Sequence, residues 1–351
     1  MANNQSKIKM WRRCQKQFAF RYDYPEELGE EGEMVRKVVG AGLYKGTWLH
    51  ALIQAHNQSW AGLDVDWHEV HEELAQQFNN LFDEEKEDLG DLPDECYRIF
   101  TSYLRFWKSD AEDFTVAKLK NKKPAIEFVL EIPLKGHDPF KCRIDLMVHD
   151  REYGGLWIWD HKWVRSVPSA EERMMNPQSN LYVWAARKAG YDVRGFLNNY
   201  GRTKAPTIPR VLKNGTLSVA KRMDTDTATY LRAVRDLHGD RAKTYVQHVY
   251  RDKIIELKNR EALWFRRERF PIGKEQIRQS LVEFMGSIKN IESRVDPWNA
   301  PRTYNYTCKR NCGYHDLCVA EFMGLDIEPI VKKQFTFEED RYAQEADLLS
   351  D

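Results

Sequence analysis

The chain has 351 residues, 42% of them apolar and 12% aromatic, enough to bury a sizeable core and to exclude wholesale disorder. The charges of its 54 basic and 54 acidic residues cancel, so the chain has no net positive charge. A surface that binds nucleic acid must therefore be a local basic patch. The sequence contains no run of about 18 apolar residues, so no membrane-spanning helix is predicted. Its N-terminal residues also lack the apolar core of a secretory signal. We therefore expect a cytoplasmic protein whose six cysteines are metal ligands or core thiols rather than disulfides.

The part of the chain before residue 108 is predicted to be mainly helical. Residues 24–33 are rich in Pro, Gly and Glu and indicate an exposed loop, whereas residues 46–107 show helical periodicity. One buried helix face is expected to carry Cys96, Ile99, Phe100, Tyr103, Leu104 and Trp107. Cys96 is therefore expected in the core.

After the turn-rich residues 118–124, strands are predicted at residues 126–134, 140–148 and 156–164. A helix is predicted from Pro177 to Lys188 with Asn176 as its N-cap, followed by a strand over residues 191–200. Helical patterns then dominate to about residue 291, before a cysteine-rich segment and an acidic tail. This order of elements predicts a mixed α/β core with a helical annex.

Two aspartates and a lysine lie in adjacent predicted strands. Because side chains alternate along a strand, Asp160 and Lys162 point to one face and His161 to the other. A hairpin centred between residues 152 and 153 places Asp145 opposite Asp160, about 5 Å away at the backbone. Such close carboxylates repel each other unless a cation compensates them, and they are natural ligands of Mg²⁺ or Mn²⁺.

The chemistry of this set suits phosphodiester hydrolysis. A divalent cation polarises the phosphate and lowers the pKa of the attacking water, while a lysine orients that water or stabilises the developing charge. The simpler alternative is a surface ion pair in an ordinary hairpin. The apolar run at residues 156–159 is too hydrophobic for an exposed strand and argues against that alternative.

Two further motifs lie in the order found in a known nuclease family. Gly46-Thr47-Trp48-Leu49-His50 stands at an expected helix start upstream of the aspartates, and Gln178 and Tyr182 lie on one helix face downstream. With Asp145 and Asp160-His161-Lys162 between them, the sequence resembles the RecB-like branch of the PD-(D/E)XK nucleases. The resemblance implies a restriction-endonuclease-like mixed sheet flanked by helices.

The resemblance also implies roles for these residues. It assigns the Mg²⁺ or Mn²⁺ ion to His50, Asp145 and Asp160, with the carbonyl of His161 as a further ligand. It makes Lys162 the catalytic lysine, and Gln178 and Tyr182 the residues that line the active site and contact the DNA strand. Taken alone, His50 would be interpreted as an ordinary helix histidine and Tyr182 as a core residue. Only the occurrence of all four motifs in this order favours the functional roles.

Four cysteines from the two ends of the chain form a second candidate site. Cys308, Cys312 and Cys318 lie within eleven residues, and Cys14 lies in a segment that resembles the N-terminal region of AddB-type and CRISPR-adaptation-type nucleases. In those relatives four such cysteines hold a 4Fe–4S cluster. The spacing between the first two C-terminal cysteines is one residue longer here. The alternative is a zinc site made by Cys308, Cys312, His315 and Cys318, which leaves Cys14 without a role.

Basic stretches offer candidate phosphate contacts, with a solvated charged helix as the alternative for each. The candidates are residues 118–123, Arg202 with Lys204, and Arg266, Arg267 and Arg269, which alternate with aromatic residues. Of these, Arg266 and Arg267 are the residues that we expect to bind nucleic acid. The tail over residues 335–351 contains six acidic residues and is expected to be flexible.

Together these features predict a nuclease domain over residues 1–325, with an acidic tail over residues 326–351. The family favours a DNA exonuclease acting on DNA ends in recombination, repair or phage DNA processing. The alternatives are a non-catalytic iron–sulfur subunit of a nuclease–helicase complex and a zinc-based interaction protein. No P-loop motif is present, so a helicase or recombination partner would be a separate protein.

Overall fold

The computed structural model describes residues 2–37, 41–260, 263–294, 296 and 298–338. Within these residues the centre of the molecule is a six-stranded mixed sheet of order β2-β4-β5-β6-β7, with β3 paired to β4. Its strands are β2 (Phe114–Val116), β3 (Ile126–Leu134), β4 (His137–Asp150), β5 (Leu156–Val164), β6 (Val193–Arg202) and β7 (Phe265–Pro271). Only β5 and β6 run parallel; the other described pairs of this sheet are antiparallel. The predicted α/β class with a mixed sheet is confirmed.

Helices cover both faces of this sheet. On one face, α10 (Pro177–Lys188) and α14 (Lys274–Glu292) pack through Leu181 and Phe284 into the same core as Ile158 of β5. On the other face lie α4 (Ala41–Trp60) and α7 (Leu92–Phe106), where Trp60 packs edge-on against Trp159. A strand buried on both faces needs a continuous apolar run, which explains the sequence of β5.

α5 (Trp67–Asn79) packs against α4 and α7, and α6 (Asp83–Leu89) connects it to α7 along the chain. α8 (Asp110–Asp113) packs against β2, and α9 (Ala170–Met174) precedes α10. Cys96 of α7 is fully buried, as its periodicity predicts, and burial raises the pKa of its thiol to about 12. Cys142 of β4 is likewise a buried core thiol.

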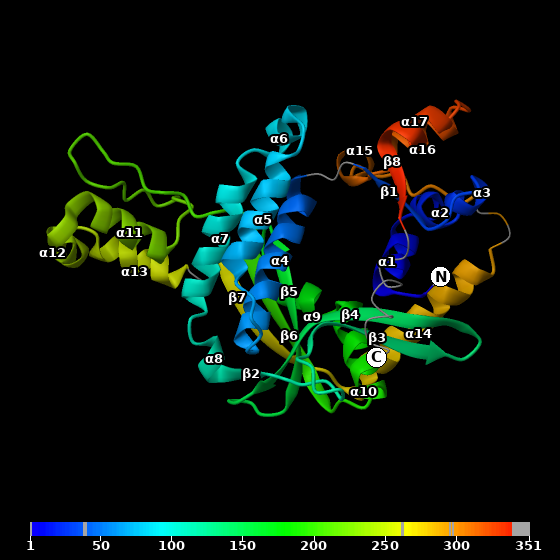
Figure 1. Cartoon of the computed structure of the whole chain (residues 1–351), viewed down its shortest axis with the longest axis horizontal. Helices are drawn as coiled ribbons and strands as arrows, with labels where there is room; N and C mark the ends of the chain where they lie inside the picture. The colour runs from blue at the N-terminus through cyan, green and yellow to red at the C-terminus, as the bar shows by residue number, and fades with distance from the viewer. Residues whose placement is uncertain (1, 38–40, 261–262, 295, 297, 339–351) are drawn as a thin grey trace.

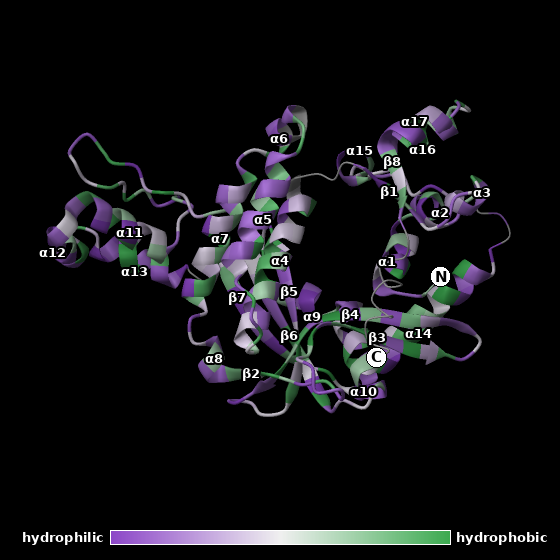
Figure 2. Ribbon diagram, in the orientation of Figure 1, coloured by the Kyte–Doolittle hydropathy of each residue, from purple (hydrophilic) through white to green (hydrophobic). Residues whose placement is uncertain are grey.

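The predicted helical annex is present and projects from the sheet (Figure 1). It consists of α11 (Thr227–His238), the 3₁₀ turn η1 (Gly239–Arg241), α12 (Ala242–His248) and α13 (Arg251–Asn259). These helices bury their own small core, centred on Tyr230, Val234 and Tyr250. Figure 2 shows hydrophilic residues on α12, at the periphery of the molecule. No described helix combines the length and the apolar character needed to cross a membrane.

Three predicted elements have the same first and last residues in the structure. These are β3, β5 and α10, whose N-cap Asn176 accepts a hydrogen bond from the Gln178 backbone at 3.1 Å. The strand expected over residues 191–200 begins two residues later, because the Tyr191 amide still bonds the Ala186 carbonyl at the end of α10. β4 is longer than expected at both ends.

Two expectations are wrong. Residues 265–271, expected in a helical region, form β7, whose arginines alternate with Glu268 and aromatic residues instead of showing a clear apolar face. The expected loop over residues 24–33 contains the short helix α3 (Tyr24–Glu27) and the first residue of β1 (Glu33–Arg36).

The two ends of the chain pack together (Figure 1). The N-terminal elements are α1 (Gln5–Arg13), α2 (Gln15–Tyr22), α3 and β1; the C-terminal ones are α15 (Cys308–Asn311), α16 (His315–Phe322), α17 (Glu328–Gln334) and β8 (Phe335–Glu338). β1 pairs antiparallel with β8, and Phe20, Tyr314 and Phe335 share one core. The expectation of a flexible tail is therefore wrong for residues 328–338, and residues 339–351 lie outside the described residues.

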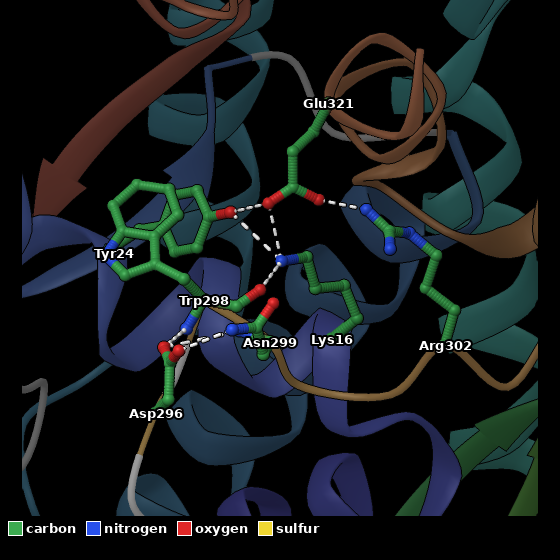
Figure 3. Close-up of polar contacts among 7 residues, drawn as sticks. All are labelled: Lys16, Tyr24, Asp296, Trp298, Asn299, Arg302 and Glu321. Carbon is green, nitrogen blue, oxygen red and sulfur yellow. Dashed lines mark hydrogen bonds and ion pairs between the residues drawn. The ribbon is translucent and has the colours of Figure 1, made fainter. Parts of the chain in front are cut away.

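A buried lysine links these two ends (Figure 3). The side chain of Lys16 is 1% exposed and forms an ion pair with Glu321 of α16. Its ammonium also donates to the Tyr24 hydroxyl at 3.1 Å and to the Trp298 carbonyl. Because the buried ammonium needs all of these partners, its ion pair and hydrogen bonds hold α2 in one position against α16.

Candidate metal centre

The register of β4 and β5 brings Asp145 and Asp160 together. Leu146 pairs with Trp159 at the end of this antiparallel ladder, and Asp145 and Asp160 are the next residues on the two strands. The register is the one that the predicted hairpin requires. Directly opposite residues share one face of a sheet, so the two carboxylates are neighbours.

A third carboxylate, which the sequence did not reveal, continues this row. The residues on either side of Glu127 pair with those on either side of Asp145, so Glu127 stands opposite Asp145 on β3. Its φ is 44°, in the left-handed region that non-glycine residues seldom adopt. Such strained residues are concentrated at functional sites, where the surrounding fold holds them in place.

His50 of α4 completes a set of metal-ligating groups with these residues. One ligand atom each of His50, Glu127 and Asp145 lies within 4.8 Å of the other two. Burial lowers the pKa of His50, so its imidazole is neutral near pH 7 and offers a lone pair. The structure thus brings together two of the predicted ligands, His50 and Asp145, and adds Glu127.

Asp160 lies beside this set and is held by two neighbours. Lys162 Nζ lies 3.0 Å from Asp160 Oδ1 and 2.9 Å from Oδ2, and Gln178 Nε2 donates to Oδ1 at 3.2 Å. Burial raises the pKa of Asp160 to about 6; the Lys162 charge opposes this shift and the Asp145 charge adds to it. Burial lowers the pKa of Lys162, but Asp160 and Asp145 outweigh it, so the net shift is upward and the ammonium stays charged.

His161 points to the opposite face of the sheet, as strand alternation predicts. Its ring is buried, with Nε2 3.3 Å from Asn57 Nδ2 and Nδ1 3.0 Å from Asn199 Nδ2. Its backbone amide donates to Asp145 Oδ2 at 2.8 Å, which fixes the orientation of that carboxylate. Burial lowers the pKa of His161 well below its usual value, so the ring is neutral.

The two residues predicted on α10 lie in different environments. Gln178 reaches Asp160, whereas Tyr182 is 8% exposed and packs in the core against Phe196, with ring centroids 6.3 Å apart. Gln178 and Tyr182 share a helix face, but only Gln178 reaches the site, whereas the Tyr182 ring lies in the core.

The predicted phosphate contact Arg267 is an interior residue. Its side chain is 6% exposed, and its guanidinium bonds the Asp110 carboxylate at 2.6 and 2.8 Å. The guanidinium also lies 3.9 Å from the Trp107 ring centroid and 4.0 Å from that of Trp159. The expectation that Arg267 contacts DNA is therefore wrong, because its donors are used inside the protein.

Among the other basic candidates, Arg266 and Lys204 are exposed, whereas Arg202 and Arg269 are half-buried. Arg266 is 46% exposed and pairs with Glu268 on the same strand. Arg202 and Lys204 both pair with Asp224 at 2.8 Å. Only Arg266 therefore keeps the exposed position that the sequence assigned to the pair of arginines on β7.

The four cysteines line one pocket between the two ends of the chain. Cys14 separates α1 from α2, and its sulfur accepts the Thr303 amide at 3.5 Å. Cys308, Cys312 and Cys318 come from α15 and α16 and face the same pocket, which Phe20 and Tyr314 also line. Burial raises the pKa of the Cys312 and Cys318 thiols, so a metal binding there would have to displace their protons.

His315, the fourth ligand of the zinc alternative, also lines this pocket, with its Nδ1 3.3 Å from Asp316. Among the described residues, no three cysteine or histidine ligand atoms at this pocket lie within 4.8 Å of one another. The 4Fe–4S cluster and the zinc ion therefore both stay predictions.

A comparison with protein-family models gives no match, and neither does a comparison with curated proteins. The function of the chain is therefore argued from its residues and their geometry.

Proposed function

We propose that the protein is a Mg²⁺- or Mn²⁺-dependent DNA exonuclease of the RecB-like PD-(D/E)XK class. The observation that carries the proposal is the row of carboxylates Glu127, Asp145 and Asp160 across three adjacent strands, with His50 and Lys162 beside it. The order of these residues in the chain supports the same family. A nuclease uses such a set to hydrolyse phosphodiester bonds.

The residues present fit a hard divalent cation. His50, Glu127 and Asp145 would hold it, and carboxylate oxygens favour Mg²⁺ or Mn²⁺. Burial, and then the nearby charge of Asp145, raise the pKa of Asp160, so a bound cation would favour its charged form. Asn198 pairs with Asp160 across β5 and β6, is fully buried, and has no hydrogen-bond partner for either side-chain atom among the described residues. A hydrated cation would supply both missing interactions.

The protein groups divide the chemical work among them. When bound, the cation polarises the phosphate and activates a water molecule. Lys162 remains charged at neutral pH, so it acts as a hydrogen-bond donor and a positive charge near the developing negative charge, not as a base. Gln178 fixes Asp160, and the His161 amide fixes Asp145, so both carboxylates are oriented before substrate binds.

We further propose that Cys14, Cys308, Cys312 and Cys318 hold a 4Fe–4S cluster with a structural role. The support is their common pocket, which brings Cys14 together with the three C-terminal cysteines. The cysteines come from segments about 300 residues apart in the sequence, so the cluster would join the N-terminal helices to α15 and α16.

Cleavage of end-labelled DNA tests the nuclease proposal. The wild type, prepared without oxygen, is expected to degrade linear single- or double-stranded DNA with Mn²⁺ or Mg²⁺, and the label pattern gives its polarity. Lys162→Ala should lower the rate at least about 100-fold, because it removes preorganised charge stabilisation. Lys332→Ala, which removes an exposed lysine paired to Glu328, should leave the rate unchanged.

Absence of cleavage by the wild type, with DNA bound and the metal cluster intact, would contradict this proposal. That result would favour the alternative of a non-catalytic DNA-binding subunit of a nuclease–helicase complex.

A further inference from the structure

A second polar pocket lies away from the metal centre, between α7 and the annex helix α11. Figure 1 shows these two helices where the annex joins the body of the molecule. The pocket is lined by Arg98, Thr101, Ser102, Arg105, Pro206, Ile208, Thr229, Arg232, Ala233 and Asp236. Three arginines in one pocket are unusual and need an explanation, because like charges repel each other.

The three arginines differ in how their charge is compensated. Arg98 is bonded to Asp94 at 2.6 Å, one turn earlier on α7. Arg105 and Arg232, by contrast, form no hydrogen bond or ion pair with any residue that the structure describes. Both side chains are exposed, and partial burial and then the Arg232 charge lower the pKa of Arg105, so the two guanidinium groups lie close enough to act on each other.

The remaining polar groups of the pocket are mostly donors. The hydroxyls of Ser102 and Thr229 accompany the two arginines, and Asp236 is the one acidic residue among those that line the pocket. Asp226, close enough to act on Arg105, is already used as the N-cap of α11 and accepts the Thr229 amide at 2.7 Å. Planar guanidinium groups with hydroxyl donors match the oxygens of a phosphate group.

The pocket continues toward the strands of the metal centre. Ser102 and Arg105 also line an adjoining pocket with the aromatic residues Phe106, Trp264 and Phe265. Phe265 pairs with Gly201 near the end of β6, one position beyond Tyr200, which pairs with Lys162. The adjoining pocket therefore lies beside the end of β6, on the face of the sheet that α7 covers.

We propose that Arg105 and Arg232 bind a backbone phosphate of the DNA strand, at a site separate from the hydrolysed bond. This assignment rests on the proposed nuclease function, since it names how the same substrate is held. It also gives the annex a purpose, because α11 supplies Arg232 while α7 supplies Arg105.

Two variants with the same change in charge test the proposal. Arg105→Gln combined with Arg232→Gln removes both pocket charges, and Arg241→Gln combined with Arg251→Gln removes two exposed charges of the annex outside the pocket. Affinity for a fluorescent single-stranded 30-nucleotide DNA is measured without divalent metal over a range of salt concentrations. Hydrolysis of bis(p-nitrophenyl) phosphate with Mn²⁺, a diester too small to reach the pocket, is measured in parallel.

The pocket variant is expected to bind the oligonucleotide about tenfold more weakly than the wild type. The slope of log affinity against log salt concentration should become shallower by about 0.7 for each phosphate that is no longer neutralised. Hydrolysis of the small diester by this variant should equal that by the wild type. Equal affinity and equal salt dependence in the two variants would overturn the pocket assignment while leaving the nuclease proposal intact. A wild type that neither binds the oligonucleotide nor hydrolyses the diester would overturn both.

Discussion

Glu127 of the candidate metal centre has an unusual backbone conformation and lies close to two other metal-ligating side chains. Its left-handed φ of 44° costs about 1–2 kcal/mol relative to an ordinary strand conformation. In return its carboxylate comes within 4.8 Å of ligand atoms of His50 and Asp145. A residue kept in a strained conformation beside two metal-ligating groups is best explained as a third ligand.

Glu127→Gln is therefore expected to weaken Mn²⁺ binding at least about tenfold, because it replaces a charged ligand by a neutral one. Glu131→Gln provides the matched control: it changes the same residue type on the same strand, where Glu131 pairs with Lys141 at 3.0 Å. Isothermal titration with Mn²⁺ measures both variants. Equal affinities for Mn²⁺ would exclude Glu127 as a ligand.

The sequence could predict the pairing of Asp145 with Asp160 but not the position of Glu127. One hairpin turn determines the first pairing. The second depends on a register shift between Ile132 and Leu134, and a shift of one residue moves every following side chain to the other face. Pro133, which lies between these two residues, is the local signal of this irregularity, but it does not give the direction of the shift.

The error over Arg267 has a different cause. Its guanidinium lies between Trp107 and Trp159, and its carboxylate partner Asp110 is 157 positions away in the sequence. Arginines and aromatic residues also lie close together in the sequence where an arginine of a strand stacks on aromatic rings inside the protein. The sequence pattern alone does not separate this arrangement from a nucleic-acid surface.

At the level of elements, predictions succeeded where the local sequence determines the structure. α10 has an Asn N-cap and a proline in its first turn, and β5 has a bounded apolar run, so both were located to the residue. β7 was missed because its charged side chains are satisfied by partners distant in sequence, such as Arg269 with Asp150 at 2.5 Å. Tertiary pairing, not propensity, makes this segment a strand.

The contact between β6 and β7 allows a test at this scale. A Cβ added at Gly195 would lie 2.2 Å from the Phe270 carbonyl oxygen, which is backbone and cannot move aside. Gly195→Ala should therefore lower the free energy of unfolding by about 3 kcal/mol. Gly286→Ala, within α14 and with no heavy atom within 4 Å of the added Cβ, should raise it by about 0.5–1 kcal/mol. Urea denaturation measures both, and equal stabilities would contradict the close approach of the two strands.

At the scale of the whole molecule, the two ends of the chain pack together beside the sheet (Figure 1). The strand pair β1–β8, the buried ion pair of Lys16 with Glu321 and the cysteine pocket all join residues near the two termini. The proposed cluster would be the third of these connections.

Cys14→Ala is accordingly expected to remove the bound iron and the brown colour, and to lower the melting temperature, because the cluster then lacks one of its four ligands. Cys96→Ala serves as the control, since this core thiol lies outside the pocket: it should lower stability but keep the iron. Iron and zinc analysis with absorption spectra of protein prepared without oxygen measures the effect. A colourless wild type with stoichiometric zinc would contradict the cluster.

The pairing of β1 with β8 also determines when the protein can finish folding. Met34 of β1 faces Phe337, about 300 residues later in the chain. At about 5–20 residues per second, a ribosome needs roughly 15–60 s to synthesise the sequence between them. Throughout that time Phe20 and Cys14 have no C-terminal partner to cover them. Insertion of the proposed cluster would therefore follow chain completion, and until then the N-terminal segment of the nascent protein is open to aggregation and oxidation.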